Sequence, residues 1–212
     1  MKHIITAGAA GVFLAAILSA PYSARANNED LRSEEVKVRR GLKLAPVPLK
    51  LAGKDVNLVG LGSYIVNAQG VCNDCHGAGP ATQYQPNGNP FFGLLPEVTN
   101  PATYLGGGRN FGPLIPVLNS PNIVSRNLTP DGGGRTLGGD SYDKFLHTMR
   151  SGVDPDNVHP LLPQPFDGKL LQIMPWPVFA HMTDHELLAV YEYLGAIPCV
   201  EGGPGEAAGR CR

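Results

Sequence analysis

The chain has 212 residues, enough for one domain with additional arms. It contains 27 glycines and 20 prolines, a composition that excludes a coiled coil or a bundle of long helices. Charged residues make up 17%, with 17 Lys and Arg against 18 Asp and Glu, so no basic field favours nucleic acid as a partner.

The first 26 residues have the layout of a secretory signal peptide. Lys2 comes before an apolar run that ends at Pro21, and small residues surround Arg25. We expect cleavage after Ala26 and export to the periplasm. A spanning helix needs about 20 apolar residues, so an uncleaved anchor is the weaker alternative. Only in that case would a membrane be a partner.

An N-terminal arm over residues 27–53 follows the signal segment. Residues 27–40 are charged and polar, which predicts a mobile segment. Residues 41–53 alternate Leu, Pro and Lys, which predicts extended backbone. This part either packs on its own domain or meets a partner.

The strongest local signal is Cys72-Asn-Asp-Cys75-His76. Two cysteines three residues apart can present both sulfurs on one side of a helical turn, and the histidine follows on nearly the same face. This spacing is typical of haem c attachment, with two thioether bonds to vinyl groups and an imidazole for the iron.

Three other interpretations of the motif are open. Zinc would need a second ligand pair, and Cys199 and Cys211 do not have the C-x-x-C spacing. A redox-active dithiol should open a helix after a strand, whereas this pair closes a helical pattern. A plain disulfide would not require histidine at the next position. Export and spacing together favour haem.

A helix is predicted before the motif, from apolar residues at helical spacing: Val56, Leu58, Leu61, Ile65 and Ala68. Gly60 and Gly62 lie inside this pattern, where each costs about 1 kcal/mol relative to alanine. Close approach of another helix or of the haem would explain them. Alternatively, the helix begins only after Gly62.

The second axial position of the iron requires Met, His or no ligand. Met149 falls on the apolar face of a helix predicted over 141–151. Met182 precedes a capping box that opens a helix over 183–194. Local structure therefore explains the presence of both methionines without a metal. Met174 has no helical role, and Pro175 biases it toward extended backbone. We therefore favour Met174, although an ordinary apolar role stays open. Weaker rivals are His147, His159, His181 and His185.

With these features in place, the chain resembles class I monohaem cytochromes c, and more closely the cytochrome c domains in the haem subunits of periplasmic alcohol and aldehyde dehydrogenases. The resemblance covers about residues 54–198. Besides the cysteine motif, it is carried by Gly62-Ser-Tyr-Ile-Val-Asn-Ala-Gln-Gly70, Asn127-Leu-Thr-Pro-Asp131, Tyr142-x-x-Phe145-x-x-x-Met149-Arg-Ser-Gly152, Met174-Pro-Trp-Pro-x-Phe179, Met182-Thr-Asp and Tyr191-x-Tyr-Leu194.

The resemblance implies an all-α cytochrome c fold, with few helices around one covalent haem c. It implies that Cys72 and Cys75 carry the thioethers, with His76 as the proximal ligand and Met174 as the distal one. It places Trp176 near the haem, and it predicts that the first and last helices cross near Gly62 and Tyr191. We expect His76 to donate its other ring N–H to a backbone carbonyl. Candidates to balance the haem propionates are Arg109, Arg126 and Arg150.

Two segments depart from the family pattern or extend beyond it. A Gly/Pro-rich insert over residues 77–124 is either a long loop that shields the haem or a loop that fills space on its own. In the tail over residues 199–212, Cys199 and Cys211 can close a disulfide in an oxidising compartment. Two free thiols are the alternative.

The sequence predicts a periplasmic electron carrier rather than an enzyme. Its partners would be redox proteins on the dehydrogenase or terminal-oxidase side, and it would act alone or as an accessory or electron-acceptor subunit. Two alternatives stay open. One is a haem enzyme or gas sensor with an open distal site. The other is a structural subunit that docks a dehydrogenase through residues 41–53.

Overall fold

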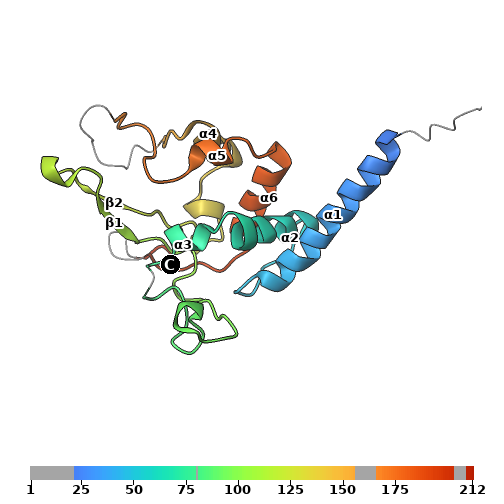
Figure 1. The fold of residues 1–212 in the computed structure, drawn as a ribbon, viewed down its shortest axis with the longest axis horizontal. Coiled ribbons are helices and arrows are strands. Elements are labelled where there is room, and N and C mark those ends of the chain that lie inside the picture. Colours follow the sequence, from blue (N-terminus) through green and yellow to red (C-terminus); the bar gives the residue numbers. More distant parts are fainter. Residues whose placement is uncertain (1–21, 80, 156–165, 203–208) are drawn as a thin grey trace, which may run out of the picture. The chain divides into compact units, whose positions relative to one another are not determined.

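The computed structural model describes residues 22–79, 81–155, 166–202 and 209–212 (Figure 1). The chain divides into two units, Met1–Ser33 and Glu34–Arg212. The described part of the first unit is the beginning of helix α1, which spans Tyr22–Leu44. Most of the predicted signal peptide therefore lies outside the described residues. Within the described ranges, no helix is both long enough and apolar enough to cross a membrane.

The fold is mixed, so the prediction of an all-α cytochrome c fold is wrong. Besides α1, the described residues form five α-helices: α2 Val56–Tyr64, α3 Cys72–His76, α4 Tyr142–Ser151, α5 Trp176–Phe179 and α6 Asp184–Leu194. Two strands, β1 Asn110–Pro113 and β2 Asn122–Val124, pair in an antiparallel sheet inside the insert (Figure 1). These strands are too short to show a period-two pattern, which is why the sequence did not predict them.

Helix α1 also differs from the expectation of a mobile arm followed by an extended segment, since it continues from Tyr22 to Leu44. A Glu35–Arg39 pair one turn apart, at 3.1 Å, supports the helix, and Val38 is buried against the rest of the domain. After the helix, Val47 is buried and the Lys50 N–H donates to the Ala196 carbonyl at 2.8 Å. The second half of the arm therefore packs on its own domain.

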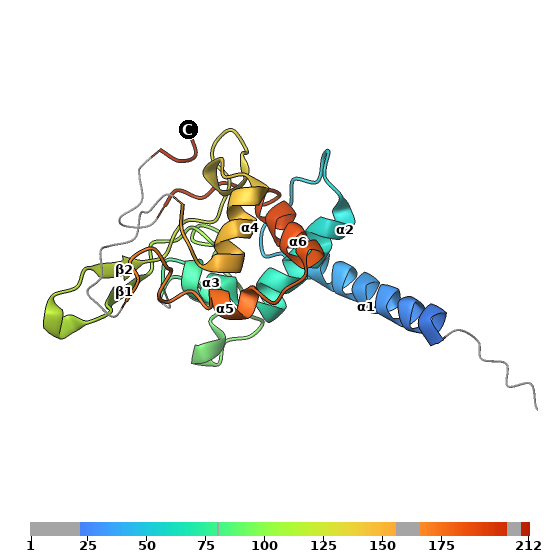
Figure 2. The same cartoon turned by 90° about the horizontal axis from the view of Figure 1, so that it is seen from above.

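The core lies where α2 crosses α6, which the two views show side by side (Figures 1 and 2). A Cβ at Gly62 would lie 1.9 Å from the Ala189 carbonyl oxygen and 2.8 Å from the Tyr193 Cβ. The predicted crossing at Gly62 is confirmed, but its partners on α6 are Ala189 and Tyr193. Tyr191 instead packs against Tyr142, with ring centroids 5.5 Å apart.

Gly60 allows a second close approach, between α2 and α1. A Cβ there would lie 2.8 Å from the carbonyl oxygen of Val38 on α1. Both glycines are part of α2, whose first turn is capped by Asp55. The alternative in which the helix begins only after Gly62 is therefore wrong.

Two buried tyrosines join the insert to the core. The Tyr104 and Tyr193 hydroxyls are 2.8 Å apart, and both contact the Asn67 side chain, at 2.6 and 3.2 Å. Burial raises the pKa of both tyrosines, that of Tyr104 well above its ordinary value. The ionised forms are thus disfavoured inside the fold.

This tyrosine pair should make the fold sensitive to alkali. A group whose pKa is raised by folding contributes full stability below its unfolded pKa, about 10 for tyrosine, and loses it as pH rises further. We expect the free energy of unfolding to fall above that pH. In Tyr104→Phe the fall should be shallower, after an initial loss of about 1–3 kcal/mol at neutral pH. Ionisation of every tyrosine near pH 10 without unfolding would contradict this expectation.

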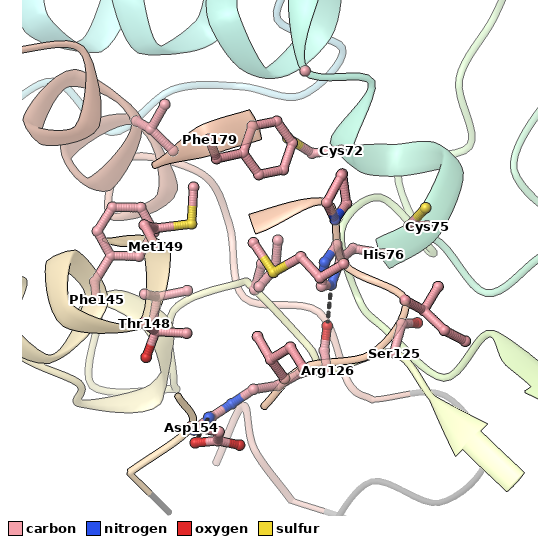
Figure 3. Close-up of a pocket in the computed structure, with 18 of the residues that line it drawn as sticks. Cys72, Cys75, His76, Ser125, Arg126, Phe145, Thr148, Met149, Asp154 and Phe179 are labelled. Atoms are coloured by element: carbon pink, nitrogen blue, oxygen red, sulfur yellow. Dashed lines mark hydrogen bonds and ion pairs between the residues drawn. The ribbon is translucent and has the colours of Figure 1, made fainter. Parts of the chain in front are cut away.

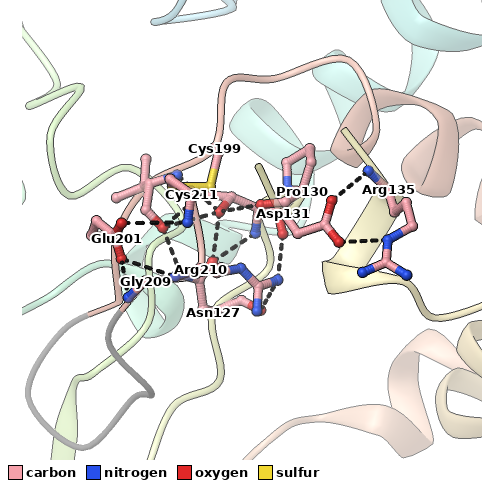
Figure 4. The surroundings of a disulfide bond; sticks show 11 residues. Asn127, Pro130, Asp131, Arg135, Cys199, Glu201, Gly209, Arg210 and Cys211 are labelled. Carbon is pink, nitrogen blue, oxygen red and sulfur yellow. Dashed lines mark hydrogen bonds and ion pairs between the residues drawn. A yellow bond between two sulfur atoms is a disulfide. The ribbon is translucent and has the colours of Figure 1, made fainter. Parts of the chain in front are cut away.

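The tail is closed by a disulfide between Cys199 and Cys211, as the sequence predicted (Figure 4). The Glu201 carboxylate accepts hydrogen bonds from the N–H groups of Gly209 and Arg210, at 3.0 and 3.1 Å. The buried Asn127 amide donates to the Val200 carbonyl at 2.9 Å. The tail is thereby attached to the segment that carries Asn127.

Removing the disulfide should destabilise the protein measurably. We expect the double variant Cys199→Ser with Cys211→Ser to lose about 3 kcal/mol or less of unfolding free energy, because a short loop is no longer closed in the unfolded chain. Urea unfolding with and without reductant measures the loss. Reductant should then no longer affect the variant, and an equal stability of both proteins under oxidising conditions would contradict the prediction.

Candidate cofactor-binding site

The C-x-x-C-H motif follows α2 through an unusual backbone path. After Tyr64 the helix widens into a π-helical turn, Ile65–Gln69, a feature that is frequent at functional sites. Val71 then adopts the left-handed conformation, with φ 43° and ψ 38°. This conformation costs a β-branched residue roughly 1–2 kcal/mol, and α3 begins at the next residue.

Cys72, Cys75 and His76 of α3 line a cavity of about 560 Å³ (Figure 3). This volume is within the range of about 300–1,000 Å³ typical of cofactor sites. Phe145, Thr148 and Met149 on α4 lie at the opposite side of the cavity. Further walls come from residues 170–175, from α6 and from β2. The lining is predominantly apolar, as expected for a site that excludes water.

The imidazole of His76 is held by a backbone carbonyl, as expected from the sequence. Its Nδ1 lies 2.7 Å from the carbonyl oxygen of Arg126 (Figure 3). Because a carbonyl can only accept, Nδ1 carries the proton and the lone pair lies on Nε2, the nitrogen that can bind a metal. The sequence could not name the acceptor, since a backbone oxygen has no signature in the sequence.

The segment around Arg126 is held in place by its own hydrogen bonds. The Ser125 N–H donates to the Arg109 carbonyl at 2.9 Å, and the Gly108 N–H donates to the Ser125 carbonyl at 2.8 Å. The Gly107 N–H donates to the carbonyl of His76 itself at 2.6 Å. The acceptor for the imidazole is therefore already oriented by the chain.

Three methionines line the cavity, where the sequence singled out one. Met174 comes from the loop before α5, Met149 from the buried face of α4, and Met182 from the residue before the α6 cap. Helical periodicity did place Met149 on a buried face, but it could not show that this face borders a cavity. Met182 precedes the predicted capping box of Thr183 and Glu186, which is present.

Trp176 does not line the cavity, contrary to the expectation that it lies beside the haem. Its indole Nε1–H donates to the Leu171 carbonyl at 3.1 Å, and its ring packs on Gly152, where a Cβ would lie 2.3 Å from the ring. Trp176 thus supports the 171–175 loop that carries Met174.

Three histidines were weaker candidates for the second iron ligand: His147, His181 and His185. They are exposed and do not line the cavity, and His159 lies outside the described residues.

Of the three arginines considered for charge balance, only Arg126 lines the cavity. Its guanidinium already contacts two carboxylates, Asp140 at 3.1 Å and Asp154 at 3.6 Å. Arg109 covers the ring of Phe111, 4.9 Å from the ring centroid. Arg150 donates to the Ala180 and Met182 carbonyls and pairs with Asp184 at 2.6 Å.

The two motif cysteines are free thiols. Burial raises the pKa of the Cys72 thiol to about 12, and Cys75 acts in the same direction. Cys72 is therefore a neutral thiol at physiological pH, unlike the low-pKa cysteine of a reactive dithiol. Cys199 and Cys211 are bonded to each other and cannot complete a zinc site with this pair. No group of three His, Cys, Asp or Glu suited to a metal occurs in the described parts of the chain.

No protein-family model, curated protein or solved structure matches the chain.

Among the described residues of the insert, those that line the cavity belong to its sheet. Phe111 on β1 and residues 122–124 on β2 line the cavity, so the hairpin shields it. The described residues between 77 and 108 do not line it. Instead, they include the strongly exposed side chains of Phe91, Phe92 and Leu95. The hairpin of the insert therefore borders the cavity, whereas the described part before it does not.

Proposed function

We propose that this chain is an electron-transfer protein that holds one haem c covalently through Cys72 and Cys75. One observation carries the proposal: both thiols, the imidazole of His76 and the thioether of Met174 line the same apolar cavity. Thiols, an imidazole and a thioether are the donor set that attached and ligated haem requires.

The cysteines would hold the cofactor by adding to its vinyl groups. Each S–H would add across a C=C bond, so that a carbon–sulfur bond forms and the hydrogen goes to the neighbouring carbon. This addition consumes no oxidant and releases no leaving group. Burial raises the pKa of the Cys72 thiol, which argues against dithiol exchange because that reaction needs a thiolate.

His76 and Met174 would hold the iron from two sides. The hydrogen bond from Nδ1 to the Arg126 carbonyl orients the imidazole, so that Nε2 is the ring nitrogen that would bind the metal. The haem supplies one-electron exchange between Fe(III) and Fe(II), and a thioether ligand raises its reduction potential. The apolar walls, which include Ile65 and Phe145, keep water out of the cavity.

We also propose that residues 1–26 export the chain to the periplasm and that its partners are redox proteins. An electron carrier needs no substrate pocket besides the cofactor site, so the proposal is not of an enzyme. Occupation of both axial positions would leave no open iron site for oxygen or peroxide.

Covalent haem is the direct test. We expect the chain, expressed with haem c maturation factors, to carry the mass of one haem after denaturation and to give a pyridine haemochrome spectrum. The variant with Cys72→Ala and Cys75→Ala should lack both signals, whereas the matched tail variant Cys199→Ser with Cys211→Ser should keep them. An exported, folded chain without bound tetrapyrrole would refute the proposal.

A further inference from the structure

The polar end of the cavity is formed by four charged side chains, which we call the charge cluster: Arg126, Asp140, Lys144 and Asp154. Asp140 contacts both cations, with Lys144 Nζ at 2.7 Å and Arg126 Nη2 at 3.1 Å. Arg126 Nη1 lies 3.6 Å from Asp154. The cluster therefore joins two positive and two negative groups in one continuous set of ion pairs.

The carboxylates of the charge cluster are largely shielded from solvent. The side chains of Asp154 and Asp140 are 6% and 18% exposed, whereas those of Lys144 and Arg126 are 24% and 39% exposed. Buried charges are screened by salt and water much less than surface charges are. Their fields therefore act across the cavity that these same side chains line.

Arg126 connects the charge cluster to the imidazole. Its carbonyl accepts the hydrogen bond from His76, and its guanidinium reaches Asp154 (Figure 3). The same residue thus belongs to the support of the proximal ligand and to the charge cluster. The charge cluster and His76 thus line the same cavity.

We propose that the charge cluster sets the reduction potential of the centre, an inference that rests on the proposed function. Oxidation adds one positive charge to the cavity. The carboxylates of Asp140 and Asp154 stabilise that charge, whereas the cations Arg126 and Lys144 oppose it. Because both signs occur in one cluster, removing an acid and removing a base should move the potential in opposite directions.

Redox titration of the haem-loaded protein at neutral pH tests this directly. Asp154→Asn should raise the reduction potential, and Lys144→Gln should lower it. Asp154→Glu, which restores the charge, should bring the potential back toward that of the unchanged protein. If Asp154→Asn does not fold, the more exposed Asp140→Asn carries the same expectation of a rise. The absorbance spectrum of each variant verifies that the axial ligands are unchanged.

A matched ion pair away from the cavity provides the control. Lys54 and Glu192 are 3.0 Å apart and similarly shielded, but neither lines the cavity. Lys54→Gln and Glu192→Gln should leave the potential unchanged. Shifts of the same sign in the acid and base variants of the cluster, or no shift, in proteins that carry haem would overturn the inference. Failure of the unchanged chain to bind haem would refute the proposed function instead.

Discussion

Replacing Met174 with alanine should leave the haem attached but remove its sulfur ligand. The thioethers proposed at Cys72 and Cys75 would not depend on the distal side, so the denatured protein should keep the haem mass. The iron should lose its low-spin spectrum and its sulfur-to-iron charge-transfer band. The reduced variant should bind carbon monoxide rapidly, because one axial position is open.

The other two methionines of the cavity serve as controls for this experiment. Met182→Leu and Met149→Leu replace a thioether by an alkyl chain of similar volume, a change that costs less than about 1.5 kcal/mol in a core. Both variants should keep the spectrum nearly intact. An unchanged sulfur-to-iron band in Met174→Ala would show that the ligand is assigned to the wrong residue. Rapid carbon monoxide binding by the unchanged protein would favour the gas sensor or haem enzyme.

Gly62→Val should disrupt the fold whether or not a cofactor is bound. Its Cβ would lie 1.9 Å from the backbone oxygen of Ala189, a position that no rotamer change can relieve. The contact between α2 and α6 would have to open, at a cost we expect to exceed about 3 kcal/mol. Loss of the cooperative thermal transition, or a large drop in the denaturation midpoint, would be observed by circular dichroism.

Gly133→Ala is the matched control for this substitution. The nearest group to a Cβ there is the Asp131 side chain at 3.3 Å, which can move, and the residue is not in the left-handed conformation. Its stability should differ from that of the unchanged protein by less than about 0.5 kcal/mol. A Gly62→Val protein with native stability would show that α2 and α6 do not pack as closely as described.

Local signals predicted α4 and α6 well, but they did not predict α1. The capping box of Thr183 and Glu186 is present at the start of α6, and α4 spans Tyr142–Ser151 within the predicted 141–151. These elements are defined by side chains a few residues apart, so the sequence carries the information directly. The close approach at Gly62 was predicted for the same reason, because two glycines inside a helical pattern needed an explanation.

Contacts between distant segments could not be predicted in this way. The sheet depends on strands of three and four residues, and the acceptor of the His76 hydrogen bond is a backbone atom 50 residues further along the chain. Trp176 packs on Gly152 and supports a neighbouring loop instead of lining the cavity. The sequence could not show this, because Gly152 is 24 residues away along the chain. The cluster around Arg126 combines residues from β2 to beyond α4, and no local pattern marks it.

The end of the chain lies close to the support of the imidazole. The Val200 carbonyl accepts the hydrogen bond from Asn127, the direct neighbour of Arg126, and the Arg210 guanidinium donates to the Thr129 carbonyl in the same segment. A chain that lacks residues 199–212 would lose both of these contacts. Changes in the tail can therefore reach the carbonyl that holds His76, although the tail is far from it in the sequence.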